Sequence, residues 1–248
     1  MSRVVVIDGG NTFLKVAHFE DDQIKFIKEY KNTAIQQDMS ILFNDLNHFC
    51  NQCTLVYGSV NNYTNQLIDI IKQKYNFKNY FEINSQIKLN FEIDKQINKN
   101  KVGVDILGGC AYAAHLNKNA LVFLLGTAMV GIFVQNNVMK LASIAPGAGS
   151  SVNHLISKAD GLKHLEFDYQ FNKQMGANTL DSIKSGYFHI LNGFILSLKD
   201  YINTEFDQLN YSTFISGGDV KNIQIQNTQK IENIVIKGYF LLYKLNNL

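Results

Sequence analysis

The chain has 248 residues, of which 46% are hydrophobic and 18% charged, and its formal net charge is +2. This length and composition are typical of a globular protein with one large core or two smaller ones. The small net charge, with no cluster of Lys and Arg longer than a pair, excludes a nucleic-acid binder. No apolar run approaches the roughly 20 residues that a membrane span needs, and no signal-type segment precedes the first strand, so we expect a cytoplasmic protein without membrane contact.

Residues 1–100 follow the pattern of a βββαβα-type domain. Runs of β-branched and aromatic residues predict strands, and apolar residues at helical spacing predict helices. The expected strands are 3–7, 13–19, 24–30, 55–57 and 79–83, and the expected helices are 41–49 and 62–75. Segment 84–101 is polar and rich in Asn and Lys, which indicates a connector or flap rather than core.

Residues 101–248 repeat this order of strands and helices. The expected elements are a helix at 102–116, strands at 120–125, 130–134 and 138–144, helices at 149–160 and 178–203, and a strand at 213–216. We therefore expect two domains of the same type, 1–100 and 101–248.

A glycine turn follows the first strand of each half. The first is Ile7-Asp8-Gly9-Gly10-Asn11-Thr12, and the second is Phe123-Leu124-Leu125-Gly126-Thr127-Ala128. Such a hairpin turn exposes successive backbone N–H groups, and glycine lets that backbone approach a ligand closely. A single glycine hairpin is most often only a turn, whereas two related by duplication predict a pair of loops that grip a polyphosphate from both sides.

Asp8 stands at the end of the first buried strand, where a charge needs compensation. Burying an unpaired ion costs several kcal/mol. Mg²⁺ together with phosphate is the natural compensation, because hard cations prefer carboxylate oxygens. Lys15, on the far side of the hairpin, either adds positive charge beside the phosphates or is an ordinary lysine of the strand surface.

Seven short motifs, in order and at about the same spacing, resemble those of the type III pantothenate kinases. They are Asp8-Gly9-Gly10-Asn11-Thr12-Phe13-Leu14-Lys15, Gly58-Ser59-Val60, Gly103-Val104-Asp105, Gly126-Thr127-Ala128, Ile144-Ala145-Pro146-Gly147, Gly176-Ala177-Asn178-Thr179 and Ser216-Gly217-Gly218. The resemblance implies the α/β fold of the acetate and sugar kinase, Hsp70 and actin superfamily. This is a duplicated RNase H-like (actin-like ATPase) fold, with two βββαβα-type halves and a nucleotide cleft between them.

The resemblance also implies an enzyme that transfers a phosphoryl group from ATP to pantothenate, the first step of coenzyme A biosynthesis. Asp105 falls on the family's catalytic aspartate, the general base for the primary hydroxyl of pantothenate, and the product is 4'-phosphopantothenate. Phosphoryl transfer needs such a carboxylate to orient the nucleophile. From the residues alone, Asp105 is equally well a first-turn or N-cap aspartate of the helix that begins near residue 104.

The same comparison of motifs assigns the binding residues. It implies that ATP is bound by Asp8, Gly9, Gly10, Asn11, Thr12, Phe13, Leu14, Lys15, Gly126, Thr127, Ala128, Gly217 and Gly218, with Asp8 also in reach of Mg²⁺. It implies that the substrate is bound by Gly103, Val104, Asp105, Ile106 and Thr179. In the family, the threonine at the position of Thr179 enters the active site of the partner subunit, which implies a homodimer with shared active sites. Thr179 is alternatively an N-cap for the helix beginning at Leu180, and it could do both.

Several positions depart from the family pattern. Ile106 replaces the arginine that would pair with the pantothenate carboxylate, Leu124 replaces the aspartate where a monovalent cation (K⁺ or NH₄⁺) binds, and Val130 replaces a threonine. Losing a charge-assisted contact costs about 1.5–3 kcal/mol, so Ile106 by itself would weaken substrate binding roughly tenfold to a hundredfold. Leu124 would remove the cation requirement, or the activity that depends on it.

Three functions are consistent with these departures. The first is a pantothenate kinase in which Lys99 or Lys101 replaces the missing arginine. The second is a kinase for another small hydroxylated substrate without a carboxylate, which Ile106 would suit. The third is a catalytically weak or inactive relative that works as a nucleotide-dependent binding or regulatory module.

Overall fold

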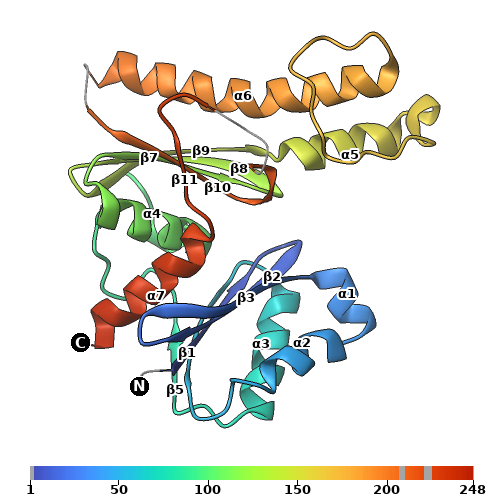
Figure 1. Ribbon diagram of the computed structural model, residues 1–248. Helices are drawn as coiled ribbons and strands as arrows, with labels where there is room; N and C mark the ends of the chain where they lie inside the picture. Colours follow the sequence, from blue (N-terminus) through green and yellow to red (C-terminus); the bar gives the residue numbers. More distant parts are fainter. Residues whose placement is uncertain (1–2, 207–209, 221–224, 248) are drawn as a thin grey trace. The chain divides into compact units, whose positions relative to one another are not determined.

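The computed structural model describes residues 3–206, 210–220 and 225–247, and the chain divides into two compact units (Figure 1). Unit 1 is Met1–Leu116 with Asn233–Leu248, and unit 2 is Asn117–Glu232. The division expected from the sequence, 1–100 and 101–248, differs from this grouping. The difference arises because the helix after residue 103 and the last helix of the chain pack together and against the first sheet.

Unit 1 is built on a mixed five-stranded sheet with the strand order β3-β2-β1-β4-β5. Its elements are β1 (Arg3–Gly9), β2 (Phe13–Glu20), β3 (Gln23–Lys31), α1 (Asn32–Gln37), α2 (Ser40–Leu46), β4 (Thr54–Ser59), α3 (Asn62–Lys74), β5 (Asn79–Glu82), β6 (Glu92–Ile93), η1 (Lys99–Lys101), α4 (Val104–Leu116) and α7 (Ile234–Asn247). Strands β1 to β3 form an antiparallel meander, and β1, β4 and β5 are parallel.

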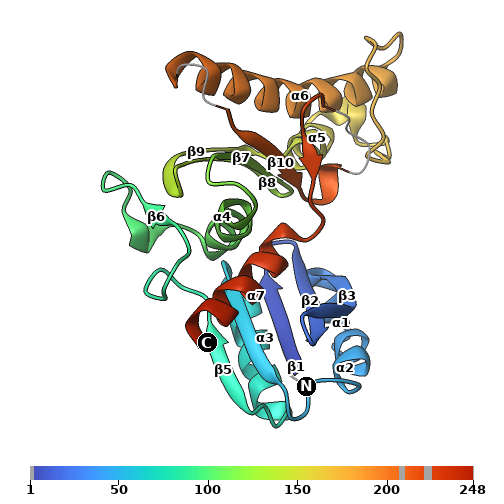
Figure 2. The same cartoon turned by 60° about the vertical axis from the view of Figure 1, so that its left-hand side comes forward.

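Different helices cover the two faces of this sheet. Side chains alternate between the faces along a strand, and Val5 and Ile7 of β1 join the core that α2 and α3 cover. Asp8 therefore points to the other face, where α4 and α7 lie against each other and α7 contacts β1 and β4 (Figure 2). On that side, the rings of Phe19 on β2 and Phe240 on α7 stack with centroids 4.0 Å apart. The face that carries Asp8 is thus covered by α4 and α7.

Unit 2 repeats this strand order in a second mixed sheet. The order within the unit is β9-β8-β7-β10-β11, with an antiparallel meander of β7, β8 and β9 and parallel pairing of β7, β10 and β11. Its elements are β7 (Ala120–Leu125), β8 (Ala128–Gln135), β9 (Val138–Pro146), α5 (Ala148–Lys158), η2 (Asp160–Leu162), α6 (Thr179–Glu205), β10 (Ser212–Ser216), η3 (Gly218–Val220) and β11 (Gln229–Lys230). Leu191 and Ile195 of α6 pack with Phe123 and Phe133 of the sheet in one core.

The duplicated α/β fold expected from the sequence is confirmed, because strands β3-β2-β1-β4-β5 and strands β9-β8-β7-β10-β11 follow the same order with the same directions of pairing. The expected strands and helices are present with small shifts of their ends. No element was expected at α1 or α7, and α7 is the larger omission because it supplies buried residues to unit 1. Among the described residues, no helix has the length and apolar character to cross a membrane.

Candidate active site

Two asparagine side chains form hydrogen bonds to the backbone of the β1–β2 turn. The side-chain amide of Asn32 donates to the carbonyl oxygens of Gly10 and Asn11, both at 3.0 Å. The side-chain amide of Asn61 lies 3.4 and 3.5 Å from the same two oxygens. A carbonyl oxygen directed at a phosphate would repel it. Because the asparagine amides engage both carbonyl oxygens, the turn is better suited to binding an anion. Neither asparagine was expected from the sequence.

Gly9 lies where no side chain fits. A Cβ added to Gly9 would be 2.8 Å from side-chain atoms of Ser59 and Thr64, whose hydroxyls are hydrogen-bonded to each other. The backbone N–H of Val60 donates to the Gly9 carbonyl oxygen at 3.0 Å. The end of β4 therefore supports the turn directly, which accounts for the Gly58-Ser59-Val60 motif.

Asp8 lies on the same face as a lysine and two further acidic side chains. It is directly opposite Lys15 on β2, and Lys15 Nζ is 2.6 Å from a carboxylate oxygen of Glu29 on β3. Burial raises the pKa of Asp8 to about 7; the charge of Lys15 opposes this shift, and the charges of Asp105 and Glu29 add to it. Lys15 is thus paired with Glu29 and also acts on Asp8 through its charge.

Asp105 lies in the first turn of α4. Gly103 leaves the space that this carboxylate occupies, because a Cβ on Gly103 would be 2.5 Å from Asp105 Oδ1. Burial raises the pKa of Asp105 above its ordinary value, and a hydrogen bond from the backbone N–H of Ile106 opposes the shift. A carboxylate with a raised pKa takes up a proton more readily.

Tyr239 of α7 lies close to both carboxylates. Its hydroxyl donates to Asp8 Oδ1 at 3.5 Å, and the charge of Asp105 acts on both Asp8 and Tyr239. The end of β1, the first turn of α4 and the middle of α7 therefore meet in one part of unit 1. Tyr239 was not expected as a site residue, although the apolar run around it could have indicated a buried helix.

The chemistry of Asp8 suits a divalent cation carried by a nucleotide. Within the described ranges, no group of three or more His, Cys, Asp or Glu side chains could hold a metal ion without help. Mg²⁺ usually takes one or two carboxylates together with substrate phosphates and water. Asp8 would supply one such carboxylate, and the nearby Lys15 is paired with Glu29.

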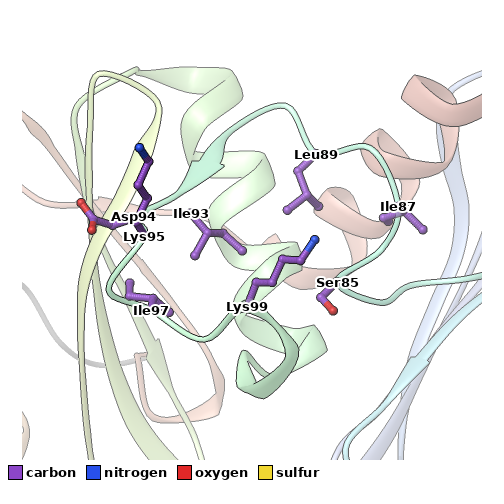
Figure 3. A pocket seen from close by; sticks show the side chains of 8 residues that line it. All are labelled: Ser85, Ile87, Leu89, Ile93, Asp94, Lys95, Ile97 and Lys99. Atoms are coloured by element: carbon purple, nitrogen blue, oxygen red, sulfur yellow. The ribbon is translucent and has the colours of Figure 1, made fainter.

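The segment before α4 forms a cavity of about 350 Å³ (Figure 3). The side chains that line it are Ser85, Ile87, Leu89, Ile93, Asp94, Lys95, Ile97 and Lys99. Its lining combines aliphatic side chains with two lysines and one aspartate. By contrast, Ile106 is only 7% exposed and offers no charge to a ligand. The segment expected to be a connector or flap therefore lines a cavity.

The second glycine turn, between β7 and β8, is enclosed by two other glycines. A Cβ on Gly147 would lie 1.9 Å from the Gly126 carbonyl oxygen, and one on Gly217 would lie 1.8 Å from the Leu125 carbonyl oxygen. Gly217 has φ of 127°, which favours glycine as well. The backbone N–H of Gly147 and the hydroxyl of Ser150 donate to the Thr127 carbonyl oxygen at 3.0 and 3.1 Å. As in the first turn, a carbonyl group is held by the protein.

These contacts bring together the predicted residues of unit 2. Gly126, Thr127 and Ala128 form the turn, and Gly217 with Gly218 follows β10 beside it. Leu124 and Val130 lie directly opposite each other on β7 and β8.

Thr179 is the first residue of α6, and its side chain is exposed. Its alternative assignment as the N-cap is wrong, because Asn178 occupies that position. The Asn178 side chain accepts a hydrogen bond from the backbone N–H of Asp181 at 2.9 Å. Asn and Thr are both good caps, so the sequence alone did not fix which of the two comes first.

Residues 4–200 match the sequence profile of the family described as type III pantothenate kinase. The chain belongs to this family. It is 34% identical to the type III pantothenate kinase of Mycoplasmopsis synoviae (strain 53), over 98% of this chain and 96% of that protein. It is 29% identical to the type III pantothenate kinase of Malacoplasma penetrans (strain HF-2), over 98% and 97% of the two chains.

Solved structures with low sequence identity have the same fold. A structure described as a Baf family transcriptional activator from Campylobacter jejuni matches with a TM-score of 0.60 at 16% identity, over 98% of this chain and all of that one. MreB5 of Spiroplasma citri bound to ADP matches with a TM-score of 0.54 at 8% identity, over 99% and 97% of the two chains. The fold of this type III pantothenate kinase family member is thus the actin-like ATPase fold.

Proposed function

We propose that this protein transfers the γ-phosphoryl group of ATP to the primary hydroxyl of pantothenate, giving 4'-phosphopantothenate and ADP. The observation that supports the proposal is the meeting of Asp8, Asp105 and the β1–β2 turn on one face of the first sheet. Phosphoryl transfer needs one carboxylate for the metal, a second carboxylate for the nucleophile and a turn that binds the phosphates. The family to which the chain belongs agrees with this assignment.

In the proposed reaction, Asp105 acts as the general base. A carboxylate oxygen of Asp105 accepts the proton of the substrate hydroxyl while the hydroxyl oxygen forms a bond to the γ-phosphorus. The bond between that phosphorus and the β–γ bridging oxygen breaks, and its electron pair leaves with ADP. The raised pKa of Asp105 favours proton uptake at this step.

The two glycine turns bind the phosphates of ATP in this proposal. In the first turn, Asn32 and Asn61 keep the carbonyl groups of Gly10 and Asn11 away from the phosphates. In the second, the start of α5 does the same for the carbonyl of Thr127. When bound through Asp8, Mg²⁺ would neutralise charge on the phosphate oxygens.

Lys99 is our candidate for binding the carboxylate of pantothenate. Ile106 cannot make that contact, whereas Lys99 lines the cavity in the segment leading to Gly103. Loss of a charge-assisted contact corresponds to roughly tenfold to hundredfold in affinity. We therefore expect Lys99→Ala to raise KM for pantothenate by that factor and to leave KM for ATP unchanged.

The deciding experiment measures ADP release with pantothenate and identifies the product by mass spectrometry. Asp105→Asn should lower kcat by about 100-fold or more, the usual contribution of a general base. Asp69→Asn is a matched control, because Asp69 is an exposed α3 carboxylate paired with Lys72 at 3.4 Å. ATP binding without pantothenate-dependent turnover would contradict the proposal.

A kinase for another small alcohol is the second candidate, and the buried hydrocarbon of Ile106 favours it. Such a substrate would lack the carboxylate that an arginine at this position would bind. Turnover of uncharged alcohols that exceeds turnover of pantothenate, and that is lost in Asp105→Asn, would establish this function instead. Absence of turnover on any alcohol, with ATP still bound, would leave a nucleotide-binding regulatory role.

We also propose a homodimer in which Thr179 reaches the partner's active site. The exposure of Thr179 at the start of α6 is consistent with this role. Sedimentation analysis tests the dimer. Mixing Thr179→Ala with Asp105→Asn subunits tests sharing. If the sites are shared, the mixed dimer contains one site with an intact Asp105 and an intact Thr179, so subunit exchange raises activity.

A further inference from the structure

Tyr239 is a polar side chain in a fully buried position of unit 1. Its exposed fraction is 0%, and it lies on α7 between β4 and α4. A buried tyrosine normally needs a partner for its hydroxyl, because an unpaired hydroxyl in an apolar interior is costly. The partner here is Asp8 Oδ1, 3.5 Å away.

Three glycines from three different segments make the space for this ring. A Cβ on Gly58 of β4 would lie 2.7 Å from the Tyr239 hydroxyl, and a Cβ on Gly108 of α4 would lie 2.7 Å from the ring. Gly238 lets α7 approach α4, since its Cβ would be 1.9 Å from the Gly108 carbonyl oxygen. The ring is therefore held on both sides, and its hydroxyl is directed to one carboxylate.

A phenylalanine would fill this space equally well, so packing does not account for the hydroxyl. The groups that act on Asp8 come from four elements: Lys15 on β2, Glu29 on β3, Asp105 on α4 and Tyr239 on α7. Lys15 is engaged by Glu29, and Asp105 and Glu29 are themselves acidic. Tyr239 is thus the neutral donor of this set. It can orient the carboxylate by a hydrogen bond without neutralising its negative charge.

We propose that Tyr239 is a positioning residue that fixes the carboxylate of Asp8 for the metal ion of the nucleotide complex. By donating to Oδ1, it orients the carboxylate that would hold the cation. This inference rests on the proposed function, in which Asp8 binds Mg²⁺. Because the phenol donates to Asp8, its removal should affect the metal more than the nucleotide or the alcohol substrate.

The test compares Tyr239→Phe with Tyr243→Phe in the full-length protein. Tyr243 lies on the same helix, and its ring packs edge-on against Phe81 with centroids 5.7 Å apart. Mn²⁺ serves as the probe, and its affinity for the complex of the protein with ADP is measured by electron paramagnetic resonance. ADP affinity without metal is measured by calorimetry, and thermal stability by circular dichroism.

We expect Tyr239→Phe to weaken Mn²⁺ binding by about threefold to tenfold, the value of one hydrogen bond. Its affinity for ADP without metal should stay at the wild-type value, and Tyr243→Phe should bind Mn²⁺ like the wild type. In turnover, the Mg²⁺ concentration for half-maximal rate should rise while KM for pantothenate does not.

Three results would overturn the inference. One is wild-type Mn²⁺ affinity in Tyr239→Phe. Another is a parallel loss of Mn²⁺ affinity, metal-free ADP affinity and thermal stability, or failure to fold, which would make the role structural. The third is failure of the wild-type ADP complex to bind Mn²⁺, which would also remove the metal site from the proposed function, whereas the first two results leave it intact.

Discussion

At the scale of single residues, Asp8 at the end of β1 carries a strongly shifted pKa. Burial raises its pKa to about 7, so the ionised form is held in the fold at a cost in free energy. The folded protein binds this proton more tightly than the unfolded chain, whose aspartate has a pKa near 3.8. The stability that the folded protein gains from binding a proton at Asp8 is therefore complete below pH 3.8, and it is lost as the pH rises through about 7. A cation at Asp8 would reverse this penalty.

Asp8→Asn should for this reason stabilise the metal-free protein at high pH. We expect a gain of about 2 kcal/mol at pH 8, or about 4–8 °C in melting temperature, with the gain shrinking towards pH 5. Thermal melts in the presence of a chelator, at both pH values, measure the difference. An equal effect at pH 5 and pH 8 would show that the charge of Asp8 is not the cause.

At the scale of elements, the β7–β8 hairpin shows how two departures from the family pattern combine. Leu124 and Val130 are separated by the turn in sequence but lie directly opposite each other in the ladder. Val130 is buried, and Leu124 is half-buried. Two hydrocarbon side chains thus occupy positions where the family has an aspartate and a threonine. Hard cations require oxygen ligands, so this pair of side chains provides none for K⁺ or NH₄⁺.

We predict that turnover by this protein is independent of monovalent cations. Rates measured in KCl, NH₄Cl and tetramethylammonium chloride at one ionic strength should agree, because the Leu124–Val130 pair cannot replace an ion's hydration shell. Steady-state assays at saturating Mg-ATP provide the measurement. Activation by K⁺ or NH₄⁺ over tetramethylammonium would mean that other oxygen atoms hold the ion.

At the scale of the whole molecule, the path of the chain determines which segments stabilise unit 1. It builds most of unit 1, then unit 2, and returns to unit 1 with α7. The helix buries Ile234, Ile236, Tyr239, Phe240 and Leu242. Burial of each such side chain is worth about 1.5–3 kcal/mol, and the net stability of a domain is only about 5–15 kcal/mol. Unit 1 is therefore incomplete without α7.

A chain that stops at Glu232 should lose the fold of unit 1. Hydrogen exchange in β1 to β5 should become fast, because the loss of α7 removes stabilisation comparable to the whole net stability. Deletion of residues 247–248 alone serves as the control and should leave exchange unchanged. Retained protection of these strands in the shorter chain would contradict the role assigned to α7.

The amino-acid sequence by itself determined the local features of this protein. Strand and helix periodicity gave most of the elements, and glycine turns after β1 and β7 indicated the duplication. The positions of Asp8 and Asp105 followed from short motifs. These features are readable because side-chain alternation, turn conformation and motif spacing depend on neighbouring residues.

Only the tertiary structure decided which distant residues complete the candidate site. Tyr239 and Asp8 are 231 positions apart, and Asn32 and Asn61 reach the first turn from two other segments. It also decided that α4 and α7 belong with the first sheet, through the close approach of Gly108 and Gly238. Such contacts depend on how whole faces of helices and sheets fit together, and a single sequence carries no local signal of that fit.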